Sequence, residues 1–225
     1  SADVLVLRHT LEHLSEPYKF LNYVVSKINT ENLTVIVEVP NFAWIAKEGA
    51  FWDITYEHVN YFDPHSLENL LSLARFSSFE SFKTFGGQYL VMIARLSDRK
   101  SRLRVKTGDR GNADEFLKNV TLRRGRIHRL IKDNSGSITI WGMSGKGVII
   151  SNLLPTSVLR RIPFALDDNE NKQYKYSPGT GHLILPHQIL KERPVKNILI
   201  MNPNYFQEMG DKLKKLGVKA KLINV

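Results

Sequence analysis

The sequence predicts an α/β protein, and two runs of residues carry this prediction. Near the start, a buried strand at 2–9, a helix at 15–32 and a buried strand at 33–40 follow one another. A strand–helix–strand crossover of this kind implies neighbouring parallel strands. Further along, 137–154 reads as a strand, a glycine-rich turn and a helix, so we expect the second half to be a small Rossmann-like unit of its own.

The first helix has a start signal and an apolar face. Ser15 is expected to be its N-cap, and Pro17 suits the first turn, where no backbone N–H is needed. Phe20, Val24 and Ile28 recur at helical spacing and share one face, as a helix that covers a sheet requires.

The remaining elements of the first unit follow from turn residues and apolar runs. Pro40 is expected to end the second strand, since proline cannot donate to a sheet ladder. A second helix is predicted at 64–76. Two strands are predicted within 79–96, joined by a turn at Gly86 and Gly87.

A change in charge divides the chain. Residues 1–95 hold seven Lys and Arg against eleven Asp and Glu, about −4, whereas 96–225 hold twenty-five against eleven, about +14. We therefore expect two units, 1–97 and 112–225, joined by a charged linker at 98–111. The basic excess indicates an anionic partner or a solvated surface.

The second unit is expected to begin with an amphipathic helix. Phe116, Val120, Ile127 and Ile131 lie on one face of this helix, opposite its arginines. Beyond the strand, turn and helix at 137–154, two further strands, a helix and a terminal strand are expected, at 161–169, 197–203, 205–217 and 219–225.

Composition narrows the class of protein. The 225 residues include no cysteine, which excludes disulfides and thiolate metal sites, and a cytoplasmic location fits that absence. No apolar run is long enough to span a bilayer, so we expect no membrane partner.

The glycine-rich turn "WGMSGKG" does not match the two common phosphate-binding motifs. Ile140 stands where a P-loop has its first glycine, Gly147 replaces the Ser or Thr, and the glycine spacing is wrong for a dinucleotide fingerprint. What remains is a helix N-terminus beside Lys146, which favours a phosphate or carboxylate. The alternative is a tight turn that allows close helix–strand packing.

Two polar loops are expected at the carboxyl ends of strands, where parallel sheets bind ligands. In "RHTLEHL", His9, Glu12 and His13 would share one face of a helical turn, but this set alone is weak support for a metal, and we expect none. In "TYEHVNYF", Glu57 beside His58 suits an acid–base pair, or else an ordinary polar loop.

Set in order, these motifs resemble one family. "RHTLEHLSEPYKFL", "VEVPNFAWI", "YEHVNYF" and "LDDNENKQYKYSPGTGHLI" are similar to class I sugar C-methyltransferases that depend on S-adenosylmethionine (SAM). Members of this family add a branching methyl group to C3 of a nucleotide-linked 4-keto-deoxysugar. The resemblance implies a partial class I methyltransferase (Rossmann-like) sheet followed by a small Rossmann-like domain.

The family layout also holds a Cys-rich zinc module and a glycine-rich SAM loop, and this sequence has neither. The strand at 2–9 resembles the family's fourth strand, so we expect the C-terminal part of a longer enzyme, inactive by itself. Half a sheet implies an exposed edge at the strand from Val4 to Leu7, where self-association is plausible.

The resemblance assigns roles to three groups of residues. It implies that His58 is the base that forms an enolate, Glu57 its orienting neighbour and His13 a donor to the enolate oxygen. The residues implied to lie beneath SAM are Arg8, His9, Thr10 and Leu11. The residues implied to contact the nucleotide-sugar substrate are Tyr56, Thr55, Lys146, Ser144 and Gly145.

Two other functions remain to be weighed. One alternative is a non-catalytic module that binds a nucleotide-sugar without binding SAM. Binding of nucleic acid through the basic stretch 99–132 is less favoured, because aromatic side chains do not alternate with its Lys and Arg as stacking platforms require.

Overall fold

The computed structural model describes residues 3–28, 32–97, 111–134 and 136–224. The chain divides into two compact units, 1–120 and 121–225. Each unit combines helices with a sheet, so the expected α/β class is confirmed. The linker expected at 98–111 lies outside the described residues except for Gly111.

The first unit contains a four-stranded mixed sheet. β1 is parallel to β2, β2 is antiparallel to β4, and β4 is antiparallel to β3. The order is therefore β1-β2-β4-β3, with β1 at one edge. The strands are β1 (Val4–Arg8), β2 (Thr34–Pro40), β3 (Phe76–Thr84) and β4 (Tyr89–Leu96).

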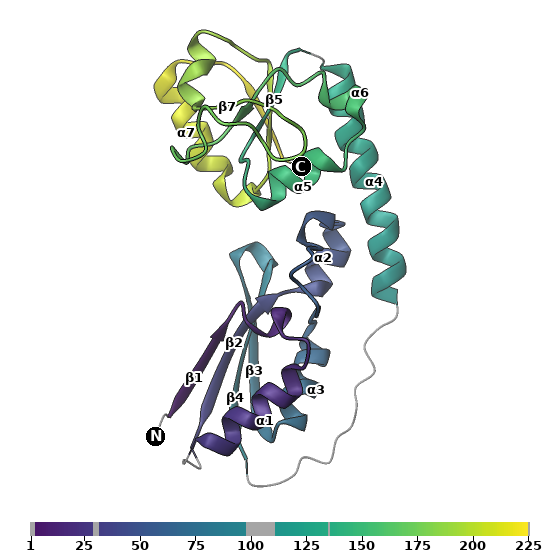
Figure 1. The fold of residues 1–225 in the computed structure, drawn as a ribbon, viewed down its shortest axis with the longest axis vertical. Helices are drawn as coiled ribbons and strands as arrows, with labels where there is room; N and C mark the ends of the chain where they lie inside the picture. The colour runs from purple at the N-terminus through teal and green to yellow at the C-terminus, as the bar shows by residue number, and fades with distance from the viewer. Residues whose placement is uncertain (1–2, 29–31, 98–110, 135, 225) are drawn as a thin grey trace. The chain divides into compact units, whose positions relative to one another are not determined.

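Two helices cover one face of this sheet, α1 (Pro17–Lys27) and α3 (Pro64–Leu73) (Figure 1). Alternate residues of β2 point into the resulting core, since Val35, Val37 and Val39 are fully buried. The shorter elements of the unit are η1 (Leu11–His13), α2 (Phe42–Glu48), η2 (Phe51–Asp53) and η3 (Phe85–Gly87).

The helix starts differ in how they are capped. The N-cap of α1 is Glu16, so the predicted cap at Ser15 was wrong by one residue, and no side chain caps this helix. At α3, Asp63 accepts from the backbone N–H of Ser66 at 2.7 Å, and the Ser66 hydroxyl oxygen accepts from the Asp63 N–H. This capping box satisfies backbone N–H groups at the start of α3, shortly after the loop that contains His58.

The second unit contains a five-stranded sheet in which all pairings are parallel. The strand order is β7-β6-β5-β8-β9, so the chain proceeds from β5 toward one edge and then returns to β8 on its other side. The strands are β5 (Ile138–Trp141), β6 (Ala165–Leu166), β7 (Ile184–Leu185), β8 (Asn197–Ile200) and β9 (Lys221–Asn224).

Helices lie on both faces of the second sheet, with α7 on one side and α5 and α6 on the other (Figure 1). Met209 and Leu213 of α7 pack against Trp141, Ile198 and Ile200 of the sheet. The elements are α5 (Gly145–Asn152), α6 (Thr156–Leu159), η4 (His187–Lys191), η5 (Pro203–Tyr205) and α7 (Phe206–Leu216).

The long helix α4 (Gly111–Asp133) crosses the division between the units. Its first part packs in the first unit, where the Asn119 side chain donates to the carbonyls of Ala46 and Lys47 at 3.1 and 3.0 Å. Gly49 lies so close that a Cβ there would be 2.5 Å from the Asn119 carbonyl carbon. Gly49 is therefore required by packing as well as by its φ of +57°.

Candidate functional site

Backbone hydrogen bonds join the two polar loops of the first unit. The Glu12 carbonyl accepts from the N–H groups of Val59 and Asn60 at 2.9 and 3.1 Å. The Asn60 side chain donates to the carbonyls of Leu11 and Leu14 at 3.2 and 2.6 Å. The segments "RHTLEHL" and "YEHVNYF" are thereby held side by side, 40 or more positions apart in sequence.

This joining brings two histidines together. The rings of His13 and His58 lie 5.0 Å apart between centroids in an edge-to-face arrangement. His13 Nδ1 lies 2.8 Å from the Glu57 carbonyl oxygen, and because a carbonyl only accepts, Nδ1 carries the proton. His58 Nδ1 is buried and has no hydrogen-bond partner within the described parts of the chain.

A buried carboxylate completes the cluster. Glu12 is 1% exposed, and its Oε1 lies 3.1 Å from His9 Nδ1. Its Oε2 is buried with no partner among the residues described. His9 Nε2 lies 3.4 Å from Glu38, which also accepts from Arg8 at 2.6 Å. The pKa of Arg8 is raised above its usual value chiefly by this hydrogen bond to Glu38.

Glu12, His13 and His58 face a cavity of about 330 Å³. It lies beyond the carboxyl ends of β1 and β2, where parallel strands direct their following loops. The lining residues are His9, Glu12, His13, Pro40, Asp53, His58, Gln88 and Tyr89.

Tyr61 contacts the loop that contains His58 through its ring and its hydroxyl group. Its ring lies 6.2 Å from that of His58, and its hydroxyl makes a hydrogen bond with the Thr55 backbone. Burial raises the pKa of Tyr61, the Thr55 bond lowers it less, and Asp53 adds to the rise. The phenol is therefore neutral at physiological pH.

Glu12, His13 and His58 also offer one metal-ligating atom each, and these atoms lie within 4.8 Å of one another. Two imidazoles and a carboxylate suit a divalent transition metal. The sequence grouped Glu12 and His13 with His9, whereas the fold groups them with His58. The expectation that the chain has no metal site stays a prediction.

The residues predicted to lie beneath SAM occupy different environments. Arg8 is exposed, Thr10 is half-buried, and Leu11 is 0% exposed, so only the backbone of Leu11 can face a ligand. His9 has a φ of +48°, in the left-handed region that only a few per cent of non-glycine residues adopt. Such backbone strain is concentrated at functional sites, and it occurs here directly after β1.

Three predicted residues lie in the loop before His58. Tyr56 is 97% exposed and Glu57 is exposed, and the described structure records no contact of the Glu57 carboxylate with His58. Thr55 is half-buried, and its carbonyl accepts from the His58 N–H at 3.3 Å. The buried carboxylate of the cluster is thus Glu12, whose burial no sequence pattern indicated.

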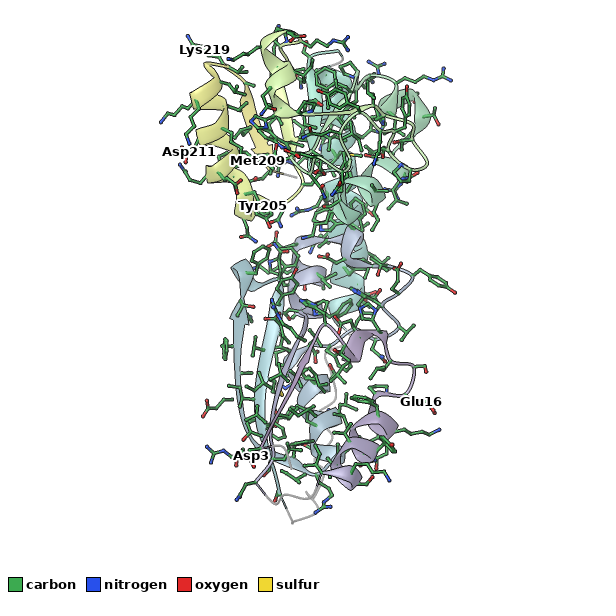
Figure 2. The ribbon with its side chains drawn as sticks, turned by 60° about the vertical axis from the view of Figure 1, so that its left-hand side comes forward. Asp3, Glu16, Tyr205, Met209, Asp211 and Lys219 are labelled. Carbon is green, nitrogen blue, oxygen red and sulfur yellow. The ribbon has the colours of Figure 1, made fainter. Side chains whose placement is uncertain are left out.

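The second unit has its own polar crevice, of about 480 Å³, at the carboxyl edge of its sheet. Ser144 is the N-cap of α5 but makes no side-chain cap, and Gly145 and Lys146 begin the helix. All three predicted residues line this crevice. Tyr205 and Met209, which also line it, lie at the start of α7 and on that helix (Figure 2).

A network of charges that the sequence analysis missed lines the crevice. Asp167 lies 3.1 Å from Lys172, and Asp168 lies 2.8 Å from His187 Nδ1 and 2.7 Å from Lys212. Burial lowers the pKa of Lys212, but hydrogen bonds to Asp168 and Glu208 outweigh it, so the pKa is raised. The sequence feature that could have indicated this network is the "LDDN" run, whose two acids directly follow β6.

Comparison with known families now bears on these two sites. The family model described as the C-methyltransferase C-terminal domain matches residues 103–223, just over half of the chain. The chain belongs to this family. The match includes the crevice of the second unit, and the cluster of Glu12, His13 and His58 lies outside it.

Membership makes the chain part of a C-methyltransferase and confirms the resemblance that the motifs indicated. No curated protein matches the sequence. None of the helices in the described parts of the chain is long and apolar enough to cross a membrane.

Proposed function

We propose that the chain supplies the proton-transfer site of a SAM-dependent C-methyltransferase that acts on a nucleotide-linked keto-deoxysugar. The observation that carries this proposal is the unpartnered, buried Nδ1 of His58, placed 5.0 Å ring to ring from His13 at one cavity. Methylation at carbon requires removal of a proton next to a carbonyl, and two imidazoles at one site suit that chemistry.

His58 is the base in this proposal. Its ring lines the cavity and its Nδ1 has no partner within the described structure, so the proposal assigns the free lone pair of this imidazole to a substrate C–H group. Its position depends on the backbone contacts of Val59 and Asn60 with Glu12, and on the Thr55 carbonyl. The electron pair of the broken C–H bond moves into the carbonyl group and forms the enolate.

His13 stabilises the enolate oxygen. Because Nδ1–H of His13 donates to the Glu57 carbonyl, only Nε2 can face the substrate, and it donates only when the ring is an imidazolium. Glu12, buried beside both rings, is the carboxylate that balances this charge. A donor placed where negative charge develops is often the largest single contribution to catalysis.

The residues after β1 fit one end of the cofactor. Arg8, His9, Thr10 and the backbone of Leu11 would lie against the methionine part of SAM, and the left-handed φ of His9 shapes that turn. When bound, SAM supplies an electrophilic methyl group to the enolate carbon. The residues of this chain orient the ketone, hold the proton and exclude water.

Each unit also has residues of its own that are proposed to bind a part of a nucleotide-sugar. In the first unit these are Tyr56 and Thr55, for a sugar, and in the second unit the N-terminus of α5 at Ser144, Gly145 and Lys146, for phosphates. The strand order β7-β6-β5-β8-β9, with all strands parallel, supports a Rossmann-like second unit. In such sheets the order of strands along the chain reverses at a central strand, and nucleotides bind at that point.

Proton transfer can be tested apart from methyl transfer. The chain would be incubated in D₂O with a nucleotide-linked 4-keto-deoxysugar, without SAM, and deuterium incorporation next to the ketone would be followed by proton NMR. We expect exchange above the uncatalysed rate, and a loss of about 10²–10⁴-fold in His58→Gln. His13→Gln should slow exchange as well, since the enolate loses its donor.

His65→Gln is the matched control, because His65 is exposed on α3 and does not line the cavity. Exchange by His58→Gln at the wild-type rate would overturn the assignment of the base. Binding of the nucleotide-sugar without any exchange by the folded wild-type chain would favour the non-catalytic binding module.

A further inference from the structure

The second unit has another cavity, of about 610 Å³, at the opposite edge of its sheet from the crevice. Ile162 and Pro163 line it just before β6 begins, and His182 and Leu183 line it directly before β7. Because the strands of this sheet are parallel, these residues mark the amino edge, and no described residue lines both this amino-edge cavity and the crevice. Its volume is in the range of about 300–1,000 Å³ for small-molecule sites.

The buried part of the lining of the amino-edge cavity is apolar. Leu154, Leu159 and Ile162 line the cavity and are 8%, 9% and 3% exposed. These side chains come from α6 and from the residues that flank it. An apolar group that contacts them is removed from water, which favours its binding.

The "PGTG" loop lines one side of the cavity and is fastened to α5. The side chain of Asn152, the last residue of α5, donates to the Pro178 carbonyl at 3.0 Å. Gly179 has a φ of +78°, and a Cβ there would lie 1.9 Å from Asn152 Oδ1, so this close approach requires glycine. A Cβ on Gly181, in contrast, would meet no atom within 4 Å. The loop is therefore held against the helix while its other side, at Gly181, stays open.

His182 ties the same loop to the end of α6. Its Nε2 lies 3.1 Å from the Leu159 carbonyl oxygen, and because a carbonyl only accepts, Nε2 carries a proton. Its Nδ1 lies 2.9 Å from the Thr180 hydroxyl oxygen, from which the neutral ring accepts a hydrogen bond. Both ring nitrogens are thus engaged within the protein, so His182 shapes the cavity and leaves ligand binding to other side chains.

Arg160 gives the cavity a positive charge. Among the described residues that line the cavity, it is the only Lys, Arg, Asp or Glu. Its side chain is exposed, and its guanidinium makes no hydrogen bond or ion pair within the described parts of the chain. The planar guanidinium matches a carboxylate through two parallel hydrogen bonds. An unpaired guanidinium beside buried apolar side chains complements a ligand that is anionic at one end and apolar at the other.

We propose that the amino-edge cavity binds a small amphipathic carboxylate, with the charge carried on an aromatic or branched apolar body. Arg160 holds the carboxylate, and the apolar body lies on Leu154, Leu159 and Ile162. A phosphate is less favoured, because it carries up to two negative charges and the cavity supplies one positive charge. The inference goes beyond the proposed function, since the described residues of this cavity include none from the crevice or from the cavity at His13 and His58.

The test compares three matched probes on the wild-type chain at neutral pH, by NMR titration of the ¹⁵N-labelled protein. The probes are 3-phenylpropionate, 3-phenylpropanamide, which keeps the apolar body without the charge, and acetate, which keeps the charge without the body. We expect 3-phenylpropionate to bind about tenfold more tightly than either of the others, the effect of hydrogen bonds to a charged group. The backbone amide signals of Gly179 and Gly181 should shift, and that of Gly145 in the crevice should not.

Arg160→Gln should reduce the affinity for 3-phenylpropionate to that for the amide and leave binding of the amide unchanged. Arg129→Gln is the matched control, because Arg129 is exposed on α4 and does not line the cavity.

The proposal would be overturned by equal affinities for acid and amide, by shifts at Gly145 in place of Gly181, or by no shift with the acid in large excess. Unchanged binding of the acid by the folded Arg160→Gln variant would overturn it as well. No probe is a nucleotide or a ketone, so this result is separate from deuterium exchange, and either proposal can fail while the other stands.

Discussion

His13 Nδ1 donates to the Glu57 carbonyl oxygen across 2.8 Å, which links η1 to a loop more than 40 residues later in the sequence. This hydrogen bond leaves one nitrogen of His13 for chemistry. It also explains why Glu57 matters through its backbone, whereas the carboxylate at the cavity belongs to Glu12.

Asn60→Ala should destabilise the first unit and slow deuterium exchange. The Asn60 side chain bonds two carbonyls, and its removal leaves those of Leu11 and Leu14 short of a donor, at a cost of about 1–3 kcal/mol. Thermal unfolding and the exchange rate would be measured together. Asn22→Ala on α1 is the control, and equal effects from both variants would contradict a specific role for Asn60.

Added Zn²⁺ should inhibit deuterium exchange, and a chelator should restore it. Glu12, His13 and His58 offer three ligand atoms within 4.8 Å, and a metal on the His58 imidazole would occupy the lone pair of the proposed base. The exchange rate would be followed while Zn²⁺ and then EDTA are added. Loss of exchange on chelation of the purified chain would instead show that a metal takes part in the reaction.

Gly147→Ala should destabilise the second unit, whereas Gly145→Ala should not. The first places a Cβ 2.1 Å from a backbone oxygen, and overpacking of this kind costs about 1–3 kcal/mol or more. The second meets no atom, so stability is kept, while nucleotide affinity falls because the approach to α5 is narrowed. Urea unfolding and calorimetry check both, and similar stability of the two variants would contradict these roles.

Lys212→Met should reduce stability at neutral pH and lose its effect in alkali. The pKa of Lys212 is raised in the folded chain, so its stabilising contribution is complete below the unfolded pKa of about 10.4 and disappears as the pH rises through the folded value. Urea midpoints of the variant and wild type should therefore differ at about pH 8, by up to about 1 kcal/mol, and converge in strong alkali.

Lys214→Met, on an exposed position of the same helix, is the control for this pH series. A difference between Lys212→Met and wild type that persists unchanged into alkali would show that the effect comes from packing of the side chain and not from its charge.

Val6→Lys should reduce self-association of the chain. β1 is the edge strand of the described sheet, and Val4 and Val6 on it are 52% and 60% exposed. An apolar edge with unpaired backbone groups can pair with another copy, and lysine on an edge opposes this. Sedimentation velocity over a range of concentrations would measure it, and an unchanged concentration dependence in the variant would rule out this edge.

Local patterns were sufficient for the fold class and for most of the longer elements, but they did not predict α2, α6 or β7, or the contacts between loops. Apolar periodicity and the crossover order predicted the α/β class, and turn residues predicted the strand pair at 79–96. The meeting of His13 and His58 depends on Asn60 and on backbone carbonyls of η1, and such bonds have no residue pattern of their own.

The second unit shows the same limit. The turn at Gly145 was evident as a helix start, but the separate task of each glycine depends on φ and on neighbouring atoms. Asp167 and Asp168 were missed because the strand predicted at 161–169 ran through both acids, whereas β6 ends at Leu166 and leaves them at its carboxyl end. Residues that a fold brings together from three strands are found only once the strand order is known.

The separate hydrophobic cores of the two units have a consequence for how this family can diversify. A substitution in the core of the second unit leaves the core side chains behind His13 and His58 in place, because the two clusters share no residue. The two units can therefore change sequence independently of one another.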